Sequence, residues 1–469
     1  MKTISAKAIA EIVEGTYQGP DNLEISGGCV FDSREVKPGD LFLALRGESA
    51  DGHDFIDEAL AKGAALALTT REVEMPHIVV GDVLASIARL AQAIRADLKE
   101  LKVVGITGSQ GKTTTKDILK TVLSQAGETV VARGSYNNEL GAPLTLLNCN
   151  EKTRFCVVEM GARHTGDIAA LVRIANPDVG AVLRVGTAHL GEFGSREKIA
   201  QTKAELIQGL RDGASAVLGC YDEFTPRMAD GLRRTVITFG ESSECNVRAA
   251  DLEIRGGYAQ FDLVTPEGRE PVELRLLGAH QTANALAAAA IAFALGLKTS
   301  EIAAGLSSHE SASRWRMELH DVGGILIIND AYNANPESME AALQTLALLT
   351  QERGGRSWAF LATMHELGGE SSALHRKVGQ IAHALQIDHL VAIGNKDFLH
   401  GAANSATHEH FFSDYKGATN LIGKLEAGDV VLVKGSRAEH LEELAAAILA
   451  HVSDANLDVA NSNGGGAGQ

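Results

Sequence analysis

The sequence predicts an α/β protein with three domains, and three observations support this prediction. A chain of 469 residues is long enough for about three domains at roughly 150 residues each. Short apolar runs alternate with helical patterns along most of the chain, which is typical of parallel βα units with covered sheet faces. The pattern of apolar and polar residues also changes twice, near residue 100 and near residue 313. We therefore place domains at residues 1–99, 100–312 and 313–452, followed by a low-complexity tail at 453–469 that is expected to be disordered.

The first domain is expected to mix short strands and helices, because Gly and Asp punctuate its apolar stretches. Residues 1–15 carry Glu11 and Glu14 within an apolar pattern. This pattern predicts a short amphipathic helix rather than a signal peptide.

The second domain is predicted to be a mononucleotide-binding parallel sheet of the phosphate-loop type with an added antiparallel sheet. It begins with a buried strand, LKVVGITG, and a helix, GKTTTKDILKTVLSQAG. Further apolar runs predict strands at 129–132, 155–161, 178–185 and 214–219. Residues 246–277 alternate polar and apolar side chains around Gly-Gly and Pro-Glu-Gly turns, which predicts antiparallel hairpins. An Ala-rich helix is expected at about 281–295.

The third domain is predicted to be Rossmann-like, because a second series of βα units begins near residue 313. Its strands are expected at 325–330, 357–363, 389–394 and 429–436. Its helices are expected near 337–350, 372–385 and 437–451.

Composition excludes several classes of protein. Apolar residues make up 45% of the chain, which is enough to bury several cores and excludes bulk disorder. The chain has 43 Lys and Arg against 60 Asp and Glu, a net charge of −17. A nucleic-acid partner is therefore not expected, because neutralising a polyphosphate requires a basic face. The longest apolar run, Ala285 to Leu295, is too short to span a bilayer.

The cysteines predict neither a disulfide framework nor a zinc site, because they are isolated and lack CxxC spacing. They are Cys29, Cys149, Cys156, Cys220 and Cys245. Free thiols in a reducing compartment are the simplest interpretation. We expect a cytoplasmic protein that acts as a monomer.

A glycine-rich loop between the first strand and helix of the second domain predicts a phosphate site. Its glycines let backbone N–H groups converge on phosphate oxygens, and the helix N-terminus adds positive potential. Lys112 can bridge β- and γ-phosphates, and the Thr113 hydroxyl can bind Mg²⁺. The general GxxxxGK[ST] pattern is not met, because its first glycine would fall at Ile106. The loop and the start of the helix predict ATP contacts by Gly108, Ser109, Gln110, Gly111, Lys112, Thr113 and Thr114.

GITGSQGKTTT resembles the phosphate loop of the Mur ligases, the ATP-dependent amide-forming enzymes of peptidoglycan precursor synthesis. The resemblance extends from about residue 25 to about residue 440. The segment DAYNANP at 330–336 resembles the motif of the branch that adds D-alanyl-D-alanine. The DNPR motif of the diaminopimelate-adding branch is absent from the sequence.

The resemblance implies an ATP-dependent ligase that joins D-alanyl-D-alanine to UDP-N-acetylmuramoyl-tripeptide. The tripeptide carboxylate would attack the γ-phosphate, and the dipeptide amine would attack the resulting acyl phosphate. The tripeptide's third residue can be lysine or diaminopimelate. Two alternatives stay open: a folylpolyglutamate-type ligase, and a binding protein whose domain closure ATP controls.

The resemblance also implies two Mg²⁺ ions and a modified lysine. Glu159 and Thr113 would bind magnesium, and His189 would bind a second ion. Lys203 matches a lysine that becomes carbamylated in the family, so that its carbamate can draw metal ions to the site. Lys112, Lys203, His189 and Arg316 are the residues that we expect to be catalytic.

Further ATP contacts are implied on both sides of the cleft. The segment GAHQTANALAAAA resembles the family's GxHNxxNxLAA, which directs Gln281 and Asn284 toward the adenine. The first amide is Gln where Asn is usual, so Asn284 is preferred. Arg316 aligns with an arginine that reaches the γ-phosphate, with Arg314 as the alternative because Trp315 replaces the usual Gly. Asp330 would hold the ATP ribose.

Candidate substrate contacts come from all three domains. The DSR and ALRG segments of the first domain resemble the UDP-sugar-binding region, and the YNN and DAYNANP segments resemble peptide-side motifs. The predicted contacts are Ser33, Arg34, Arg46, Gly47, Asn137, Asn138, Tyr332, Asn333 and Asn335. KGSR at 434–437 resembles the family's closing motif, whereas LATMHELGGES lacks the usual acidic residue at position 363.

Overall fold

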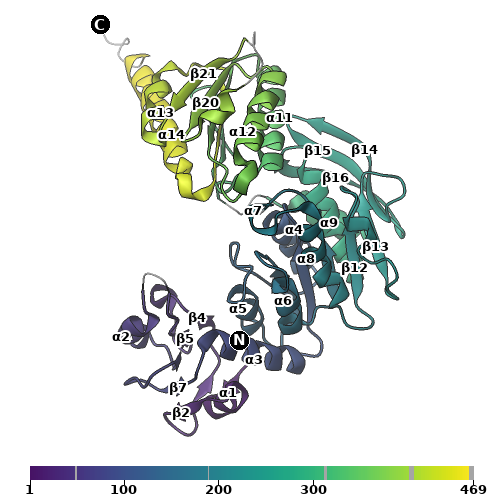
Figure 1. The fold of residues 1–469 in the computed structure, drawn as a ribbon, viewed down its shortest axis with the longest axis vertical. Coiled ribbons are helices and arrows are strands. Elements are labelled where there is room, and N and C mark those ends of the chain that lie inside the picture. The colour runs from purple at the N-terminus through teal and green to yellow at the C-terminus, as the bar shows by residue number, and fades with distance from the viewer. Residues whose placement is uncertain (48–49, 189, 311–313, 401–405, 464–469) are drawn as a thin grey trace.

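The computed structural model describes residues 1–47, 50–188, 190–310, 314–400 and 406–463, with side chains described as far as residue 453. Three lobes follow one another along the longest axis of the molecule (Figure 1). The N-terminal lobe lies at one end, the C-terminal lobe at the other, and the central lobe between them. The predicted α/β class with three domains is confirmed.

The N-terminal lobe contains a five-stranded sheet in the order β2-β7-β6-β5-β4, counted over the described residues. Its strands are β2 (Thr16–Gln18), β4 (Cys29–Val30), β5 (Leu41–Leu43), β6 (Leu66–Thr69) and β7 (His77–Val79). A separate antiparallel pair joins β1 (Ile4–Ser5) to β3 (Glu24–Ile25). The helices are α1 (Ala6–Val13), α2 (Ile56–Ala61) and α3 (Val83–Asp97). The predicted amphipathic helix near the N-terminus is α1, which buries Ile9 and Val13.

The central lobe carries a sheet with the order β16-β15-β14-β13-β12-β11-β8-β10-β9. The strands from β9 to β14 pair in parallel, and β14, β15 and β16 form antiparallel hairpins, as predicted. The strands are β8 (Lys102–Thr107), β9 (Glu128–Val131), β10 (Thr153–Glu159), β11 (Val179–Val182), β12 (Ser215–Gly219), β13 (Val236–Gly240), β14 (Val247–Arg255), β15 (Tyr258–Thr265) and β16 (Gly268–Leu277). Strand β13 was not predicted from the sequence.

Helices cover the central sheet. They are α4 (Lys112–Ser124), α5 (Gly141–Leu147), α6 (Asp167–Ala175), α7 (Leu190–Phe193), α8 (Arg196–Gln208), α9 (Gln281–Ala294) and α10 (Thr299–Ser308). Most alanines of α9 are buried, and their small side chains let this helix pack closely on α4 and the sheet.

The C-terminal lobe contains a sheet in the order β17-β18-β22-β19-β20-β21. Only the β17–β18 pairing among its described strands is antiparallel, so the predicted Rossmann-like arrangement is confirmed. The strands are β17 (Glu318–Val322), β18 (Ile325–Asp330), β19 (Ser357–Ala362), β20 (His389–Ile393), β21 (His408–Phe412) and β22 (Val430–Lys434). The helices are α11 (Pro336–Arg353), α12 (Ser371–Ala384), α13 (Tyr415–Ala418) and α14 (Leu441–Asn463).

One sequence-based expectation differs from the structure at the C-terminus. Helix α14 continues to Asn463 and so includes residues 453–463, for which disorder was predicted. A helix that is already formed can propagate into such a segment, because adding a residue to an existing helix costs much less than nucleating a new one. The predicted tail beyond 463 lies outside the described residues. None of the helices in the described ranges has both the length and the apolar character that a membrane crossing needs.

Candidate active site

A cavity of about 1110 Å³ lies between the central and C-terminal lobes. The carboxyl ends of β8 and β10 contribute to it from the central sheet, and those of β18 and β22 from the C-terminal sheet. Ligands bind at such edges in open α/β sheets. The predicted site residues that line it are Ser109, Gln110, Gly111, Lys112, Thr113, Thr114, Asn137, Asn138, Glu159, Lys203, Gln281, Asn284, Arg316, Asp330, Tyr332, Asn333 and Asn335.

The phosphate loop connects β8 to α4 and forms one wall of the cavity. Gly111 has φ 81°, and a Cβ atom there would lie 2.3 Å from Asn284 Oδ1, so a larger residue does not fit. Lys112 Nζ donates to Gly108 O at 2.8 Å. Burial is the main reason why the pKa of Lys112 is lowered, and the nearby Arg316 adds to the effect while Glu159 opposes it. An anion at this position would stabilise the charge of Lys112.

Oxygen atoms suited to magnesium lie next to this loop. Glu159 ends β10 and is 1% exposed. Its Oε2 accepts from Thr113 Oγ1 at 3.0 Å, and its Oε1 accepts from Asn137 Nδ2 at 3.0 Å. A hydroxyl, a carboxylate and an amide form a donor set that fits Mg²⁺. The described residues contain no group of three or more His, Cys, Asp or Glu side chains placed for a metal, and His189 lies outside those residues.

Lys203 reaches the same cavity from α8 and is 7% exposed. Desolvation lowers its pKa to about 7, and the charge of Lys112 acts in the same direction. A large fraction of Lys203 is therefore a neutral amine near neutral pH, which is the form that can react with CO₂.

Two amides at the start of α9 contact each other. Asn284 Nδ2 donates to Gln281 Oε1 at 2.8 Å, and Gln281 Nε2 lies 3.1 Å from His280 Nε2. Burial lowers the pKa of His280 to about 4, so this imidazole is neutral at pH 7. Both amides line the cavity.

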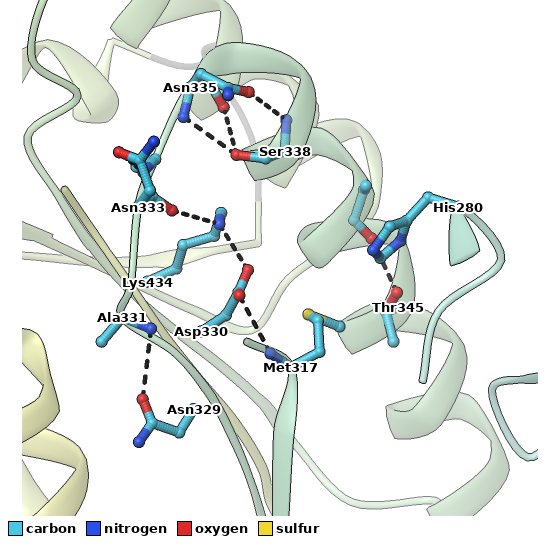
Figure 2. A network of polar contacts seen from close by, with 12 residues as sticks. His280, Met317, Asn329, Asp330, Ala331, Asn333, Asn335, Ser338, Thr345 and Lys434 are labelled. Atoms are coloured by element: carbon cyan, nitrogen blue, oxygen red, sulfur yellow. Dashed lines mark hydrogen bonds and ion pairs between the residues drawn. The ribbon is translucent and has the colours of Figure 1, made fainter. Parts of the chain in front are cut away.

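A buried lysine organises the DAYNANP segment of the C-terminal lobe (Figure 2). Lys434 Nζ donates to Asp330 Oδ2 at 2.6 Å and to Asn333 O at 2.9 Å, while Asp330 Oδ1 accepts from Met317 N at 3.1 Å. Asp330 and Lys434 are register partners on β18 and β22, which explains why the pair forms. Asn335 caps α11, because its Oδ1 accepts from Ser338 N at 2.9 Å.

The geometry separates the two candidate arginines. Arg316 lines the cavity, and its Cζ lies 4.0 Å from the centre of the Tyr332 ring. Arg314 is exposed and is not among the described cavity-lining residues. Of the two candidates, Arg316 is therefore the one that lines the cavity containing the phosphate loop.

Other predicted contacts lie outside this cavity. Gly108 is in the phosphate loop but does not line the cavity. Ser33 Oγ donates to Glu58 Oε2 at 2.7 Å, and Arg34 pairs with Asp32 on the surface of the N-terminal lobe. Arg46 and Gly47 lie in that same lobe, where Gly47 N donates to Ala50 O at 2.8 Å. The structure therefore does not bring these four residues to the phosphate loop.

Sequence reasoning missed several residues that shape the site. Lys116 Nζ donates to Ala132 O at 2.8 Å and to Gly134 O at 2.9 Å, which fixes the loop before Ser135. Glu337 Oε1 accepts from both the N–H and the hydroxyl of Thr187, at 2.9 Å each, across the domain boundary. No local pattern signals such contacts, because their partners are distant in the sequence.

The site combines a buried lysine in a phosphate loop, a hydroxyl–carboxylate pair and an arginine from a second domain. These features are typical of an enzyme that catalyses phosphoryl transfer in a cleft between two lobes. Three family models match the chain: "Mur ligase family, catalytic domain" at 27–109, "Mur ligase middle domain" at 106–292 and "Mur ligase, glutamate ligase domain" at 315–437. The UDP-N-acetylmuramoyl-tripeptide–D-alanyl-D-alanine ligase of Mycobacterium tuberculosis is 40% identical over 96% of this chain and 98% of its own length. The corresponding ligase of Escherichia coli is 34% identical over 96% and 99%. The chain belongs to the Mur ligase family.

Solved structures agree with this assignment. MurF from Acinetobacter baumannii has a TM-score of 0.85 at 33% identity and covers 96% of this chain and 99% of its own. MurF from Thermotoga maritima in complex with ADP has a TM-score of 0.77 at 30% identity, with coverages of 91% and 98%. Folylpolyglutamate synthase from Mycobacterium tuberculosis is only 17% identical at a TM-score of 0.60 over 78% and 95% of the two chains, so it shares the fold alone.

Proposed function

We propose that this chain is an ATP-dependent ligase that joins D-alanyl-D-alanine to UDP-N-acetylmuramoyl-tripeptide through an acyl phosphate, with release of ADP and phosphate. The observation that carries the proposal is that Lys112, Glu159 and Arg316 line one cavity between two lobes. The curated relatives with this activity in their names support the choice of substrates.

Phosphorylation of a carboxylate requires strong local positive charge, because the attacking group and the γ-phosphate are both anionic. Lys112 enters from the phosphate loop, and Arg316 enters from the opposite lobe. Mg²⁺ held by Thr113 and Glu159, with a second ion at His189 and carbamylated Lys203, would supply further charge neutralisation when bound. The two cationic side chains stabilise the charge that develops as ADP leaves.

The second step forms the amide. The dipeptide amine attacks the acyl carbon, its N–H proton is lost, and phosphate leaves as the C–N bond is completed. Asn137, Asn138, Tyr332, Asn333 and Asn335 are candidates for holding the two peptides near the cavity. Closure of the lobes excludes water, which would otherwise hydrolyse the acyl phosphate.

The uridine end of the substrate is assigned to the N-terminal lobe. Ser33, Arg34, Arg46 and Gly47 are the candidate contacts, and an arginine suits a diphosphate through its planar donor fork. A cytoplasmic location and a monomeric state complete the proposal.

The test is an incubation of the protein with Mg²⁺, ATP, UDP-muramoyl-tripeptide and D-alanyl-D-alanine. We expect ADP, phosphate and the UDP-muramoyl-pentapeptide in equal amounts, and no product with Lys112→Ala. Turnover of a folate with glutamate instead would favour the folylpolyglutamate alternative. ATP binding without turnover of either substrate pair would favour a nucleotide-regulated binding protein.

A further inference from the structure

We propose that Ser135 and Tyr332 form a cross-domain clamp that holds Arg316 at the phosphate site, so that both are positioning residues for phosphoryl transfer. This inference rests on the proposed function and adds a role for two side chains. Ser135 belongs to the loop between β9 and α5 of the central lobe, and Tyr332 follows β18 of the C-terminal lobe.

Tyr332 makes two contacts with different parts of its side chain. Its hydroxyl lies 2.6 Å from Ser135 Oγ, and its ring lies under the Arg316 guanidinium with 4.0 Å between Cζ and the ring centre. One tyrosine therefore joins the central lobe to the arginine of the C-terminal lobe.

Ser135 extends this connection to the candidate magnesium site. Its Oγ lies 3.4 Å from Thr113 Oγ1, which in turn donates to Glu159 Oε2 at 3.0 Å. The backbone before Ser135 is held by Lys116, which bonds two carbonyls of the same loop. Ser135 is thus fixed from the phosphate-loop side, and the Tyr332 hydroxyl has a defined partner.

The backbone around Arg316 is also constrained. Trp315 and Met317 have φ values of 59° and 53°, in the left-handed region that non-glycine residues rarely adopt. Tyr332 N donates to Trp315 O at 3.1 Å, and Met317 N donates to Asp330 Oδ1 at 3.1 Å. Strained backbone of this kind is found where a side chain must be aimed in one direction.

An aromatic ring is a suitable partner for an arginine that must act on phosphate. A carboxylate would neutralise the guanidinium, whereas a ring face orients it and leaves its charge available. Within the described residues, Arg316 Nε is buried and has no hydrogen-bond partner. The positive charge of Arg316 contributes to lowering the pKa of Lys112. A triphosphate bound between Lys112 and Arg316 would neutralise the positive charges of both side chains.

The experiment separates the two contacts of Tyr332. Tyr332→Phe and Ser135→Ala remove the hydroxyl contact from either side, whereas Tyr332→Leu also removes the ring. We expect the first two variants to lower kcat about tenfold and the double variant to be no worse than either one. Tyr332→Leu should lower kcat about 100-fold, and adding Arg316→Ala to it should cause little further loss. KM for D-alanyl-D-alanine should stay within about twofold in Ser135→Ala, which leaves the candidate peptide contact of Tyr332 in place.

Tyr17→Phe is the matched control. The Tyr17 hydroxyl donates to Pro20 O at 2.7 Å on the surface of the N-terminal lobe, so this variant loses a tyrosine hydroxyl outside the cavity. It should retain wild-type kcat. Thermal unfolding of each variant checks that the fold is intact.

A binding measurement tests the clamp without turnover. The affinity for a non-hydrolysable ATP analogue relative to ADP should fall equally in Tyr332→Leu, Arg316→Ala and their double variant. An unchanged ratio in Tyr332→Leu would overturn the proposal, as would a raised KM for the dipeptide with unchanged kcat in Ser135→Ala. Additive losses in Ser135→Ala and Tyr332→Phe would also overturn it. Failure of the proposed function appears differently, as a wild-type protein that binds the analogue but does not join these substrates.

Discussion

Lys203 illustrates how burial changes the chemistry of a single residue. Its pKa of about 7 arises mainly from desolvation, with a further contribution from the positive charge of Lys112. An exposed lysine is almost entirely protonated at neutral pH and cannot attack CO₂. At Lys203 the neutral amine can form an N–C bond with CO₂ and release a proton. The product is an anion suited to the cationic wall of the cavity.

Lys203→Ala should therefore lower turnover by about 100-fold or more, since a preorganised charge at the reacting centre is lost. Removing CO₂ from the buffer should lower wild-type turnover in a steady-state assay, and added bicarbonate should restore it. Bicarbonate should not rescue the variant. Lys198→Ala is the control, because Lys198 is exposed on the same helix. Undiminished turnover in Lys203→Ala would contradict the carbamate assignment.

At the scale of the element, helix α11 has a well-defined start that involves a predicted substrate residue. Asn335 and Ser338 form a capping box, and Pro336 occupies the first turn. This arrangement gives Asn335 a structural role beside the substrate contact that the sequence predicted.

Asn335→Ala should lower the free energy of unfolding by about 1 kcal/mol, the usual cost of removing an N-cap. Asn335→Asp should retain most of that stability, since a carboxylate oxygen can accept the same bond. Urea unfolding measures the difference. If Asn335 also contacts the dipeptide, Asn335→Asp will raise KM for D-alanyl-D-alanine while stability is retained; an unchanged KM would leave the cap as its only role.

A stack of aromatic rings on β19, β20 and β21 predicts sensitivity to acid. The His389 ring stacks on Trp358 with centroids 3.6 Å apart, and the His410 ring centre lies 5.8 Å from that of His389. Desolvation, followed by His408 and His410, lowers the pKa of His389 to about 4, and the pKa of His410 is lowered as well. The folded state therefore favours the neutral rings, and the unfolded state binds more protons between pH 6.5 and about 4.

Stability from this stack should be complete above pH 6.5 and decline as the pH falls toward 4. Thermal unfolding across this range should show the decline, together with contributions from other buried histidines. His389→Phe should flatten the profile, because phenylalanine can stack on Trp358 but cannot be protonated. An identical slope in the variant would contradict this explanation.

The elements that the sequence predicted are those with strong local signals. The phosphate loop between β8 and α4 follows from its glycines and lysine, and the β14–β16 hairpins follow from alternation and turns. By contrast, β21 (HEHFF) has polar residues where an apolar run would be expected, and parallel pairing with β20 makes it a strand. The Ser135–Tyr332 contact could not be predicted either, since it depends on how two lobes meet.

At the scale of the whole molecule, the two domain boundaries differ in character. Helix α3 of the N-terminal lobe packs on α5 and α6, and both lobes contribute to one apolar core. Arg95 reinforces this boundary, because its guanidinium is buried and donates to Asp178 and to Ala175 O. The C-terminal lobe instead meets the central lobe at the cavity through polar pairs, including Thr187–Glu337 and Ser135–Tyr332. Polar contacts such as Thr187–Glu337 can be exchanged for other polar contacts at small cost. We therefore expect the C-terminal lobe to move while the Ser135–Tyr332 contact is kept.

Substrate binding should therefore make the molecule more compact. The candidate uridine contacts lie in the N-terminal lobe, and the phosphate loop lies in the central lobe, so the substrate must bridge both before the third lobe closes over it (Figure 1). A compact chain of this length has a radius of gyration of about 23 Å, and the three-lobed arrangement should exceed this value. X-ray scattering with Mg²⁺, a non-hydrolysable ATP analogue and UDP-muramoyl-tripeptide should show the radius falling toward it. Lys112→Ala should show no such fall, because it lacks the lysine that holds the triphosphate. A radius that stays constant while the wild-type enzyme is saturated and active would mean that the lobes are already in their working arrangement.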